Sequence, residues 1–143
     1  MEISQLIAGR AADEIVCCAA DTPMRDAVAL LAARRIGALP VVEDGQVVGI
    51  FSERDVVYRL AEEGESCLSR PVGEVMTAPP ITAGPQSNLL EALSLMTRRR
   101  IRHLPVVDDT GMCGFVSIGD LVKARLDEIQ YEAAALREYI QTA

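Results

Sequence analysis

Two stretches of the chain, residues 24–35 and 88–100, place apolar side chains at the three- and four-residue intervals of a one-sided helix. The recurring residues are Val28, Leu31 and Ala32 in the first stretch and Leu89, Leu93 and Met96 in the second. Pro23 suits the first turn of a helix, and Asn88 with Glu91 three residues on has the spacing of a capping box. The pattern predicts one amphipathic helix in each stretch.

Short apolar or β-branched runs flank each predicted helix. Residues 14–20 (EIVCCAA) and 79–84 (PPITAG) predict a strand before it, and a pair of strands follows it. Asp44-Gly45 joins the first pair with a strong hairpin signal, because both turn residues need positive φ. Residues 109–111 (DTG) form a looser equivalent. With the helix that follows each hairpin, the predicted unit is β-α-β-β-α.

The chain contains this unit twice. Sliding the sequence by 65 residues aligns residues 36–57 with 101–122 without a gap, and ten of the 22 aligned pairs are identical. Self-similarity of this kind indicates a duplicated supersecondary unit. One copy alone would leave an apolar face uncovered, whereas two copies packed sheet to sheet would bury both faces. We therefore predict one pseudo-symmetric α/β (α+β) module, with repeats at 1–65 and 66–125 and a helical extension at 126–143.

The last helix of the second copy is predicted to run on to about residue 140. Its apolar residues step by 4, 3, 4, 3 and 4, which is the spacing of a coiled-coil a/d seam. The seam residues are Val122, Leu126, Ile129, Ala133, Leu136 and Ile140. Such a seam needs something to pack on, which is either another subunit, giving a homodimer, or the body of its own chain.

Composition argues against two classes of function. The net charge is −7, the pI is near 4.7, and the chain has two Phe, three Tyr and no Trp. An acidic surface repels phosphate backbones and few rings remain to stack on bases, so no nucleic-acid partner is expected. The sequence shows neither a signal peptide nor a membrane-spanning run, so we expect a cytoplasmic protein without a membrane partner.

Both hairpins run into the motif Ser-x-x-Asp, at Ser52 and Asp55 and again at Ser117 and Asp120. One interpretation is structural, because Ser caps a helix and the Asp three residues on completes a capping box. The other is functional. A helix N-terminus with a hydroxyl suits phosphate, and the two acceptor oxygens of a carboxylate suit the adjacent hydroxyls of a ribose. The recurrence of the motif, with a glycine three residues before each serine, favours a nucleotide site.

Two such copies about 65 residues apart, each with Leu-Pro-Val-Val, a hairpin and Gly-x-x-Ser-x-x-Asp, resemble the CBS (cystathionine β-synthase) domain pair, or Bateman module. The resemblance covers roughly residues 5–125. It implies a stand-alone regulatory sensor that binds AMP, ADP or ATP in clefts between the copies and acts in trans on an unknown regulated protein. NAD(H) or S-adenosylmethionine is the alternative ligand. Neither an enzyme nor a metal ion is expected, because the sequence shows no nucleophile-base pair and no metal-ligand cluster, and its one histidine has no partner constellation.

The resemblance also implies a set of ligand-binding residues: Gly37, Ala38, Ser52, Arg54, Asp55, Thr82, Arg102, His103, Ser117 and Asp120. The two aspartates would hold the ribose, the two serines and Arg54 would face the phosphate, and Thr82 would line the nucleoside. The residues just before each Leu-Pro would line the adenine or phosphate region. Cys17 stands at the equivalent of Thr82, and Ile118-Gly119 removes charge beside the second phosphate position. We therefore expect unequal clefts, with the second as the occupied one.

Several polar and sulfur-containing residues keep two interpretations. The arginines of residues 98–102 are either cations that favour a helix C-terminus or, at Arg102, a phosphate ligand. A structural hydrogen bond, rather than catalysis, is expected of His103. The four cysteines lack CxxC spacing and are expected to be reduced thiols, although a metal- or redox-responsive module and a purely structural dimer stay open as functions. They are Cys17, Cys18, Cys67 and Cys113.

Overall fold

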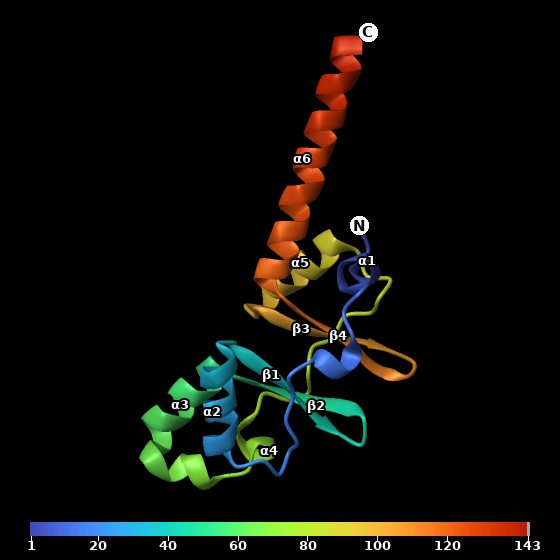
Figure 1. The fold of residues 1–143 in the computed structure, drawn as a ribbon. Helices are drawn as coiled ribbons and strands as arrows, with labels where there is room; N and C mark the ends of the chain where they lie inside the picture. Colours follow the sequence, from blue (N-terminus) through green and yellow to red (C-terminus); the bar gives the residue numbers. More distant parts are fainter. Residues whose placement is uncertain (143) are drawn as a thin grey trace.

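The computed structural model describes residues 1–142 and shows two similar lobes, one above the other, with a long helix projecting from the upper lobe (Figure 1). The lower lobe contains α2 (Met24–Arg34), β1 (Ala38–Glu43), β2 (Gln46–Ser52) and α3 (Glu53–Glu63). The upper lobe contains α5 (Leu89–Arg99), β3 (His103–Asp108), β4 (Gly111–Ser117) and α6 (Ile118–Thr142). Each of these upper elements begins 65 residues after its counterpart, which confirms the predicted duplication.

The prediction of a strand before each helix is wrong, because neither segment forms a regular strand. Ala12–Glu14 is a 3₁₀ turn, and each predicted strand is reduced to one parallel bridge to the hairpin, at Cys18 and at Ala83. In the first copy the N–H of Thr22 donates to the carbonyl of Ala19, so the chain turns away directly after its bridge. The second copy turns in the same way, and each lobe therefore keeps a two-stranded sheet.

The hairpin turns follow their sequence signals. β1 pairs antiparallel with β2, and Asp44 and Gly45 have φ angles of 50° and 77°, which confirms the two-residue turn. In the second hairpin the carboxylate of Asp108 accepts a hydrogen bond from the N–H of Thr110 at 2.8 Å, and Gly111 has a φ of 120°. The pairing register shifts between the two consecutive valines of β1 and again between those of β3. The copies therefore share even this irregularity.

Each lobe contains a short helix that belongs to the other copy in sequence (Figure 1). α1 (Ile3–Ile7) precedes the first copy but packs in the upper lobe, where the N–H of Ile3 donates to the carbonyl of Ser87 at 2.9 Å. α4 (Val72–Val75) precedes the second copy but packs in the lower lobe, where the N–H of Val72 donates to the carbonyl of Thr22 at 2.8 Å. This exchange interlocks the two lobes into one unit.

Two equivalent glycines make room for the exchanged segments. A Cβ at Gly49 would overlap Met76 and lie 2.9 Å from the carbonyl oxygen of Thr77, directly after α4. A Cβ at Gly114 would lie 3.0 Å from two side-chain atoms of Ile7 in α1. Gly49 and Gly114 lie three residues before the motif serines, and the exchanged segment of the chain approaches each of them. Both glycines therefore serve packing.

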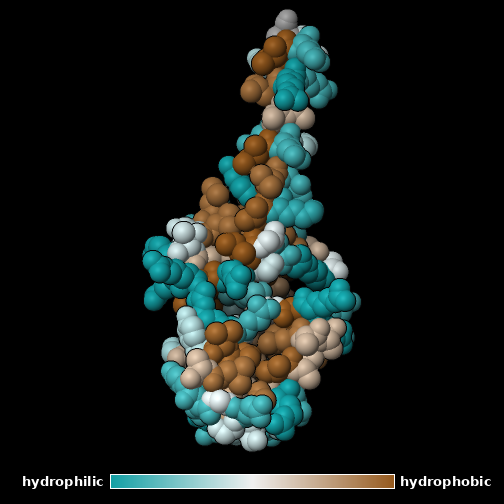
Figure 2. All heavy atoms as spheres, turned by 90° about the vertical axis from the view of Figure 1, so that its left-hand side faces the viewer, coloured by the Kyte–Doolittle hydropathy of each residue, from teal (hydrophilic) through white to brown (hydrophobic). Residues whose placement is uncertain are grey.

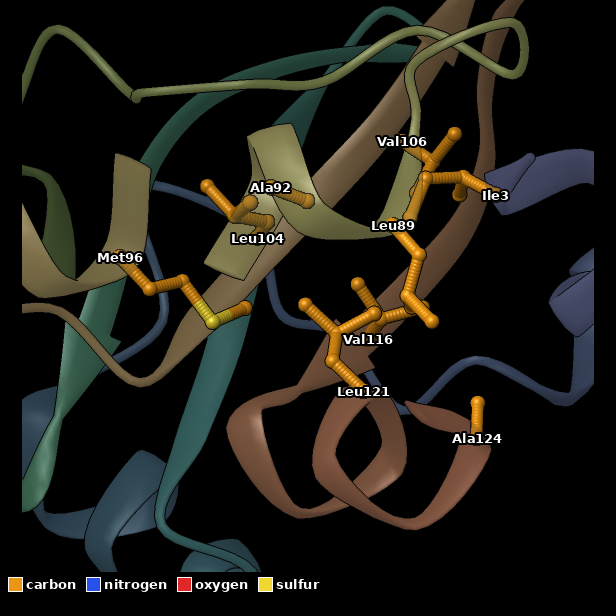
Figure 3. Close-up of a cluster of buried hydrophobic side chains, with 9 residues drawn as sticks. All are labelled: Ile3, Leu89, Ala92, Met96, Leu104, Val106, Val116, Leu121 and Ala124. Atoms are coloured by element: carbon orange, nitrogen blue, oxygen red, sulfur yellow. The ribbon is translucent and has the colours of Figure 1, made fainter. Parts of the chain in front are cut away.

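Each lobe has its own apolar core. Figure 3 shows the upper one, where side chains from α1, α5, both strands and α6 meet. Its buried members are Ile3, Leu89, Ala92, Met96, Leu104, Val106, Val116, Leu121 and Ala124. Ile3 is fully buried, so the exchanged helix is part of this core, and burying such a side chain contributes about 1.5–3 kcal/mol. Val72 and Val75 of α4 make the same contribution to the lower core.

α6 extends beyond the body, as the sequence predicted (Figure 1). Near its start Leu121 and Ala124 are buried, whereas every residue from 129 to 142 is exposed. All six residues of the predicted seam are exposed, so within one chain the seam does not fold back on its own body.

Candidate functional site

Both Ser-x-x-Asp motifs form capping boxes. In the first, the carboxylate of Asp55 accepts a hydrogen bond from the N–H of Ser52 at 2.9 Å, and the serine oxygen accepts from the N–H of Asp55 at 3.4 Å. In the second, Asp120 accepts from the N–H of Ser117 at 2.9 Å, and the serine oxygen accepts from the N–H of Asp120 at 3.1 Å. The structural interpretation is therefore confirmed. In both boxes the backbone bond uses Oδ2 alone, so Oδ1 is available for other groups.

A cavity of about 330 Å³, called the first cavity below, lies beside the first motif and is closed by the other copy. The lower lobe supplies the end of β2 and the start of α3, the upper lobe supplies the turn between α5 and β3, and the chain linking the lobes supplies a third wall. Its lining includes the polar and charged residues Ser52, Arg54, Asp55, Thr77, Arg100 and Arg102. A site at the junction of two repeats is a common position for a small ligand.

The first cavity is rich in cations although the chain is acidic. Four arginines line it against two carboxylates, those of Glu53 and Asp55. The guanidinium of Arg54 donates to the backbone carbonyl of Arg100 at 3.0 Å, which ties the start of α3 to the end of α5. Arg100 itself ends α5 with a φ of 55°. The cluster therefore agrees with both sequence interpretations, since its members end a helix and also converge on a cavity.

Thr77 completes this site from the linker. Its hydroxyl donates to Oδ1 of Asp55 at 2.9 Å, on the oxygen that the capping box leaves free. The carbonyl of the same threonine accepts from the N–H of Ile50 at 3.0 Å, so the linker is attached to β2 at this point. Each carboxylate oxygen has two acceptor directions, and Oδ1 of Asp55 can therefore accept a second hydroxyl beside Thr77.

A second cavity, of about 340 Å³, lies beside the second motif and differs in charge. Its one arginine, Arg10, lies 3.6 Å from Oδ2 of Asp120 as an ion pair, and Glu14 adds another carboxylate. Apolar residues form much of the remaining lining: Ala11, Ile15, Val16, Ile36, Ala38 and Phe115. Asp55 is thus contacted by a neutral hydroxyl from the other repeat, whereas Asp120 is contacted by a cation.

Ala38 and His103 line both cavities. They are equivalent residues of the two copies, 65 positions apart, so the pseudo-two-fold axis passes between them. The ring of His103 stacks on that of Phe115 with centroids 5.7 Å apart and planes 13° from parallel. Burial, and secondly the charge of Arg102, lowers the pKa of His103 below its ordinary value, against smaller opposing effects of Glu53 and Asp120. The lowered pKa favours the neutral form of this imidazole, which is a common wall of the two cavities.

The structure distributes the ten predicted ligand-binding residues unequally. Seven line the first cavity: Gly37, Ala38, Ser52, Arg54, Asp55, Arg102 and His103. Ser117 and Asp120 line the second, together with the shared Ala38 and His103. Thr82 is exposed and lines neither of these two cavities. Its neighbours Ile81 and Ala83 pack against the upper core, and alternate side chains of an extended segment point to opposite sides.

Sequence reasoning missed Thr77 and Arg10, the two residues that contact the motif aspartates from outside their own repeat. No local signal marks them, since each lies in an irregular segment just after a short exchanged helix. Their chain distances to the aspartates, 22 and 110 residues, are set by the exchange of α1 and α4 between lobes.

The cysteines do not gather. Within residues 1–142, no group of three or more His, Cys, Asp or Glu side chains is placed to hold a metal ion. Cys17 is exposed and Cys67 is fully buried. Burial, with the adjacent Cys17, raises the pKa of Cys18 to about 11. No helix in the described part of the chain combines the length and apolar character needed to cross a bilayer.

Two interlocked α/β repeats with a small cavity beside each capped helix define a tandem-repeat module. The chain belongs to the CBS domain family, whose profile matches residues 7–62 and again 72–127. The mitochondrial CBS domain-containing protein CBSX3 of Arabidopsis thaliana is 41% identical over 139 residues, which cover 93% of this chain and 68% of that protein. That name does not support a cytoplasmic location, which stays a prediction.

Solved structures share the fold. The CBS-domain protein ATU1752 of Agrobacterium tumefaciens superposes with a TM-score of 0.81 at 34% identity, over 87% of this chain and 99% of that one. CBSX2, solved in complex with AMP, superposes with a TM-score of 0.74 at 27% identity, over 88% of this chain and 96% of that one.

Proposed function

We propose that this CBS pair is a regulatory module that binds an adenine nucleotide in the first cavity and acts in trans on a partner protein. The observation that carries the proposal is the convergence of four arginines and a capped carboxylate on one cavity between the copies. Support also comes from CBSX2, a relative solved with AMP. ATU1752, of whose chain 99% is matched, is likewise a CBS-domain-containing protein.

The first cavity provides a suitable group for each part of a nucleotide. The N-terminus of α3, with Ser52 and Arg54, provides N–H and guanidinium donors for phosphate. Oδ1 of Asp55 provides an acceptor for ribose hydroxyls beside Thr77. Apolar residues of β2 and the linker provide walls for a flat base: Ile50, Pro79, Pro80 and Ile81.

Charge favours the first cavity over the second for this role. Phosphate in the second cavity would face Glu14 and Asp120 with only Arg10, which is already paired to Asp120. The start of α6 also lacks the cation that Arg54 supplies at the start of α3. This assignment reverses the sequence-based expectation that the second cleft is the occupied one. The same excess of arginines disfavours the sulfonium cation of S-adenosylmethionine in the first cavity.

Calorimetric titration with AMP, ADP, ATP, NAD(H) and S-adenosylmethionine tests the proposal. Asp55→Asn and Asp120→Asn form a matched pair, because each keeps an oxygen for its capping bond but loses the negative charge and replaces the second acceptor oxygen by an NH2 donor. A hydrogen bond to a charged group contributes about 1.5–3 kcal/mol, so Asp55→Asn should weaken nucleotide binding about tenfold or more. Asp120→Asn should leave it within about twofold.

Two results would count against the proposal. If no phosphorylated ligand binds, the function itself is wrong. If Asp120→Asn weakens binding and Asp55→Asn does not, the nucleotide lies in the second cavity. Replacement of Arg102 by Ala gives an independent check, since it should weaken ATP more than AMP if arginines neutralise the phosphates.

We also propose that the module works as a homodimer. The exposed seam of α6 supports this, because an apolar stripe of that length is otherwise left in water. Sedimentation velocity at micromolar concentration checks it, with a dimer mass expected.

A further inference from the structure

The free part of α6 needs a partner. From residue 129 to 142 the helix has no buried residue, which leaves about 21 Å of it outside the body at 1.5 Å per residue. Isolated helices of this length are marginal in water. The exposed fractions of Leu126, Ile129, Leu136 and Ile140 are 54%, 44%, 59% and 65%, so the seam is exposed along its whole length.

The seam lies on the opposite side of α6 from the body. Leu121 and Ala124 are the residues by which α6 packs on the upper core. At 100° per residue, this buried pair points roughly 150° away from the neighbouring seam residues Val122 and Leu126. A second helix laid on the seam would therefore not meet the body of its own chain. Figure 2 shows apolar side chains gathered along one face of α6 and continuing onto the body below it.

We propose that α6 pairs with α6 of a second copy as a parallel two-stranded coiled coil. With the seam residues at a and d, Glu132 takes position g and Arg137 takes position e. In a parallel pair the g residue faces the e residue five positions on in the other chain. Glu132 then faces Arg137 of the partner subunit, and symmetry makes this contact twice.

The antiparallel alternative brings like charges together. When all six seam layers overlap in that orientation, e faces e and g faces g. Lys123 then lies against Arg137 of the partner subunit, and symmetry makes this contact twice. Glu132 lies against Glu132 of the partner subunit. Like-charge pairs on neighbouring helical positions are destabilising. The charge pattern beside the seam therefore selects a second copy in parallel orientation.

This inference rests on the homodimer of the proposed function but not on the nucleotide site. The decisive variants are the two charge reversals Glu132→Arg and Arg137→Glu and their combination. In a parallel coil each single reversal creates repulsion at two symmetric contacts and should weaken the dimer about tenfold. The double variant restores opposite charges and should recover most of the affinity. Sedimentation equilibrium measures the dimer dissociation constant for each.

A cross-link reports the orientation independently. In a Cys17→Ser background, Ile140→Cys places a thiol at the seam near the free end of α6. It should form a disulfide-linked dimer on mild oxidation, because equivalent a positions adjoin in a parallel pair. Glu138→Cys is the matched control, since it is exposed on the outer face of the same turn and should not cross-link.

The outcomes separate the two ideas. A chain that stays monomeric at all concentrations overturns both the parallel coil and the homodimer. A stable dimer in which Arg137→Glu tightens association and Ile140→Cys fails to cross-link overturns the parallel coil alone. Nucleotide titration of the unaltered chain is unaffected by either result.

Discussion

Gly49 gives the sharpest test of the exchange between lobes. In Gly49→Ala the new Cβ would overlap Met76 and lie 2.9 Å from the carbonyl oxygen of Thr77. That carbonyl belongs to backbone, and it accepts the hydrogen bond that attaches the linker to Ile50. The segment after α4 must therefore move as a whole, because no side-chain rotation relieves the contact with the carbonyl.

The cost can be worked from these contacts. Overpacking a buried site costs about 1–3 kcal/mol, and weakening one hydrogen bond between Thr77 and Ile50 adds about 1 kcal/mol. We expect Gly49→Ala to lower the free energy of unfolding by about 2–4 kcal/mol, which corresponds to roughly 4–16 °C in Tm for a domain of this size. Nucleotide affinity should fall as well, since Thr77 would move away from Asp55.

Urea unfolding without ligand excludes a contribution from ligand binding, and one fixed protein concentration keeps the contribution of association the same for every variant. Gly84→Ala is the control, because its Cβ would meet nothing closer than 3.9 Å and its φ is ordinary. The urea midpoint of Gly114→Ala should lie between those of the other two variants, since only side-chain atoms of Ile7 lie 3.0 Å from the new Cβ. If Gly49→Ala and Gly84→Ala unfold at the same urea concentration, the account of the exchanged segment is wrong.

Two further predictions concern titratable groups. His103 has a folded-state pKa below its unfolded value of about 6.5, so the unfolded chain binds more protons and the free energy of unfolding should fall as the pH drops below about 6.5. His103→Gln should flatten this part of the profile, and an unchanged slope would contradict the assignment. Among the thiols, exposed Cys17 should react first with a thiol reagent at pH 8, whereas Cys18, with its pKa raised to about 11, should react slowly and Cys67 only on unfolding. Fast modification of Cys67 in the folded protein would show that the lower core opens.

The elements with local signals were predictable from sequence. The helical periodicity of residues 24–35 and 88–100 and the Asp44-Gly45 turn are encoded within a few residues of where they act, and the structure confirms them. The absence of a regular strand at residues 14–20 was not predictable, because strand formation depends on neighbours distant in sequence. This segment pairs with β1 at Cys18 alone. The exchange of α1 and α4 was not predictable from the sequence either, since helices of five and four residues are too short to show a periodic pattern of apolar residues.

The site was predictable only in part, because some of its contacts depend on segments that are distant in sequence and leave no local signal. The motif that ends each hairpin is local, and the structure places both copies beside cavities. Thr77 and Arg10 reach the aspartates only because the short helices cross between lobes. Thr82 stands one residue from the bridging Ala83, and in an extended segment one residue decides which side a side chain faces.

The duplication repeats the backbone but not the chemistry, and the differences lie where the copies meet. Thr77 gives Asp55 a neutral hydroxyl whereas Arg10 gives Asp120 a cation, and His103 stands where the other copy has Ala38. Because the His103 ring lines both cavities, a ligand in the first would touch the same side chain that bounds the second. Ser117 lies on that second cavity and directly precedes α6, the helix that carries the exposed seam. Under the proposed function, displacement of His103 by a bound nucleotide would therefore act on the start of α6, and His103→Ala should uncouple nucleotide binding from any change in dimer affinity.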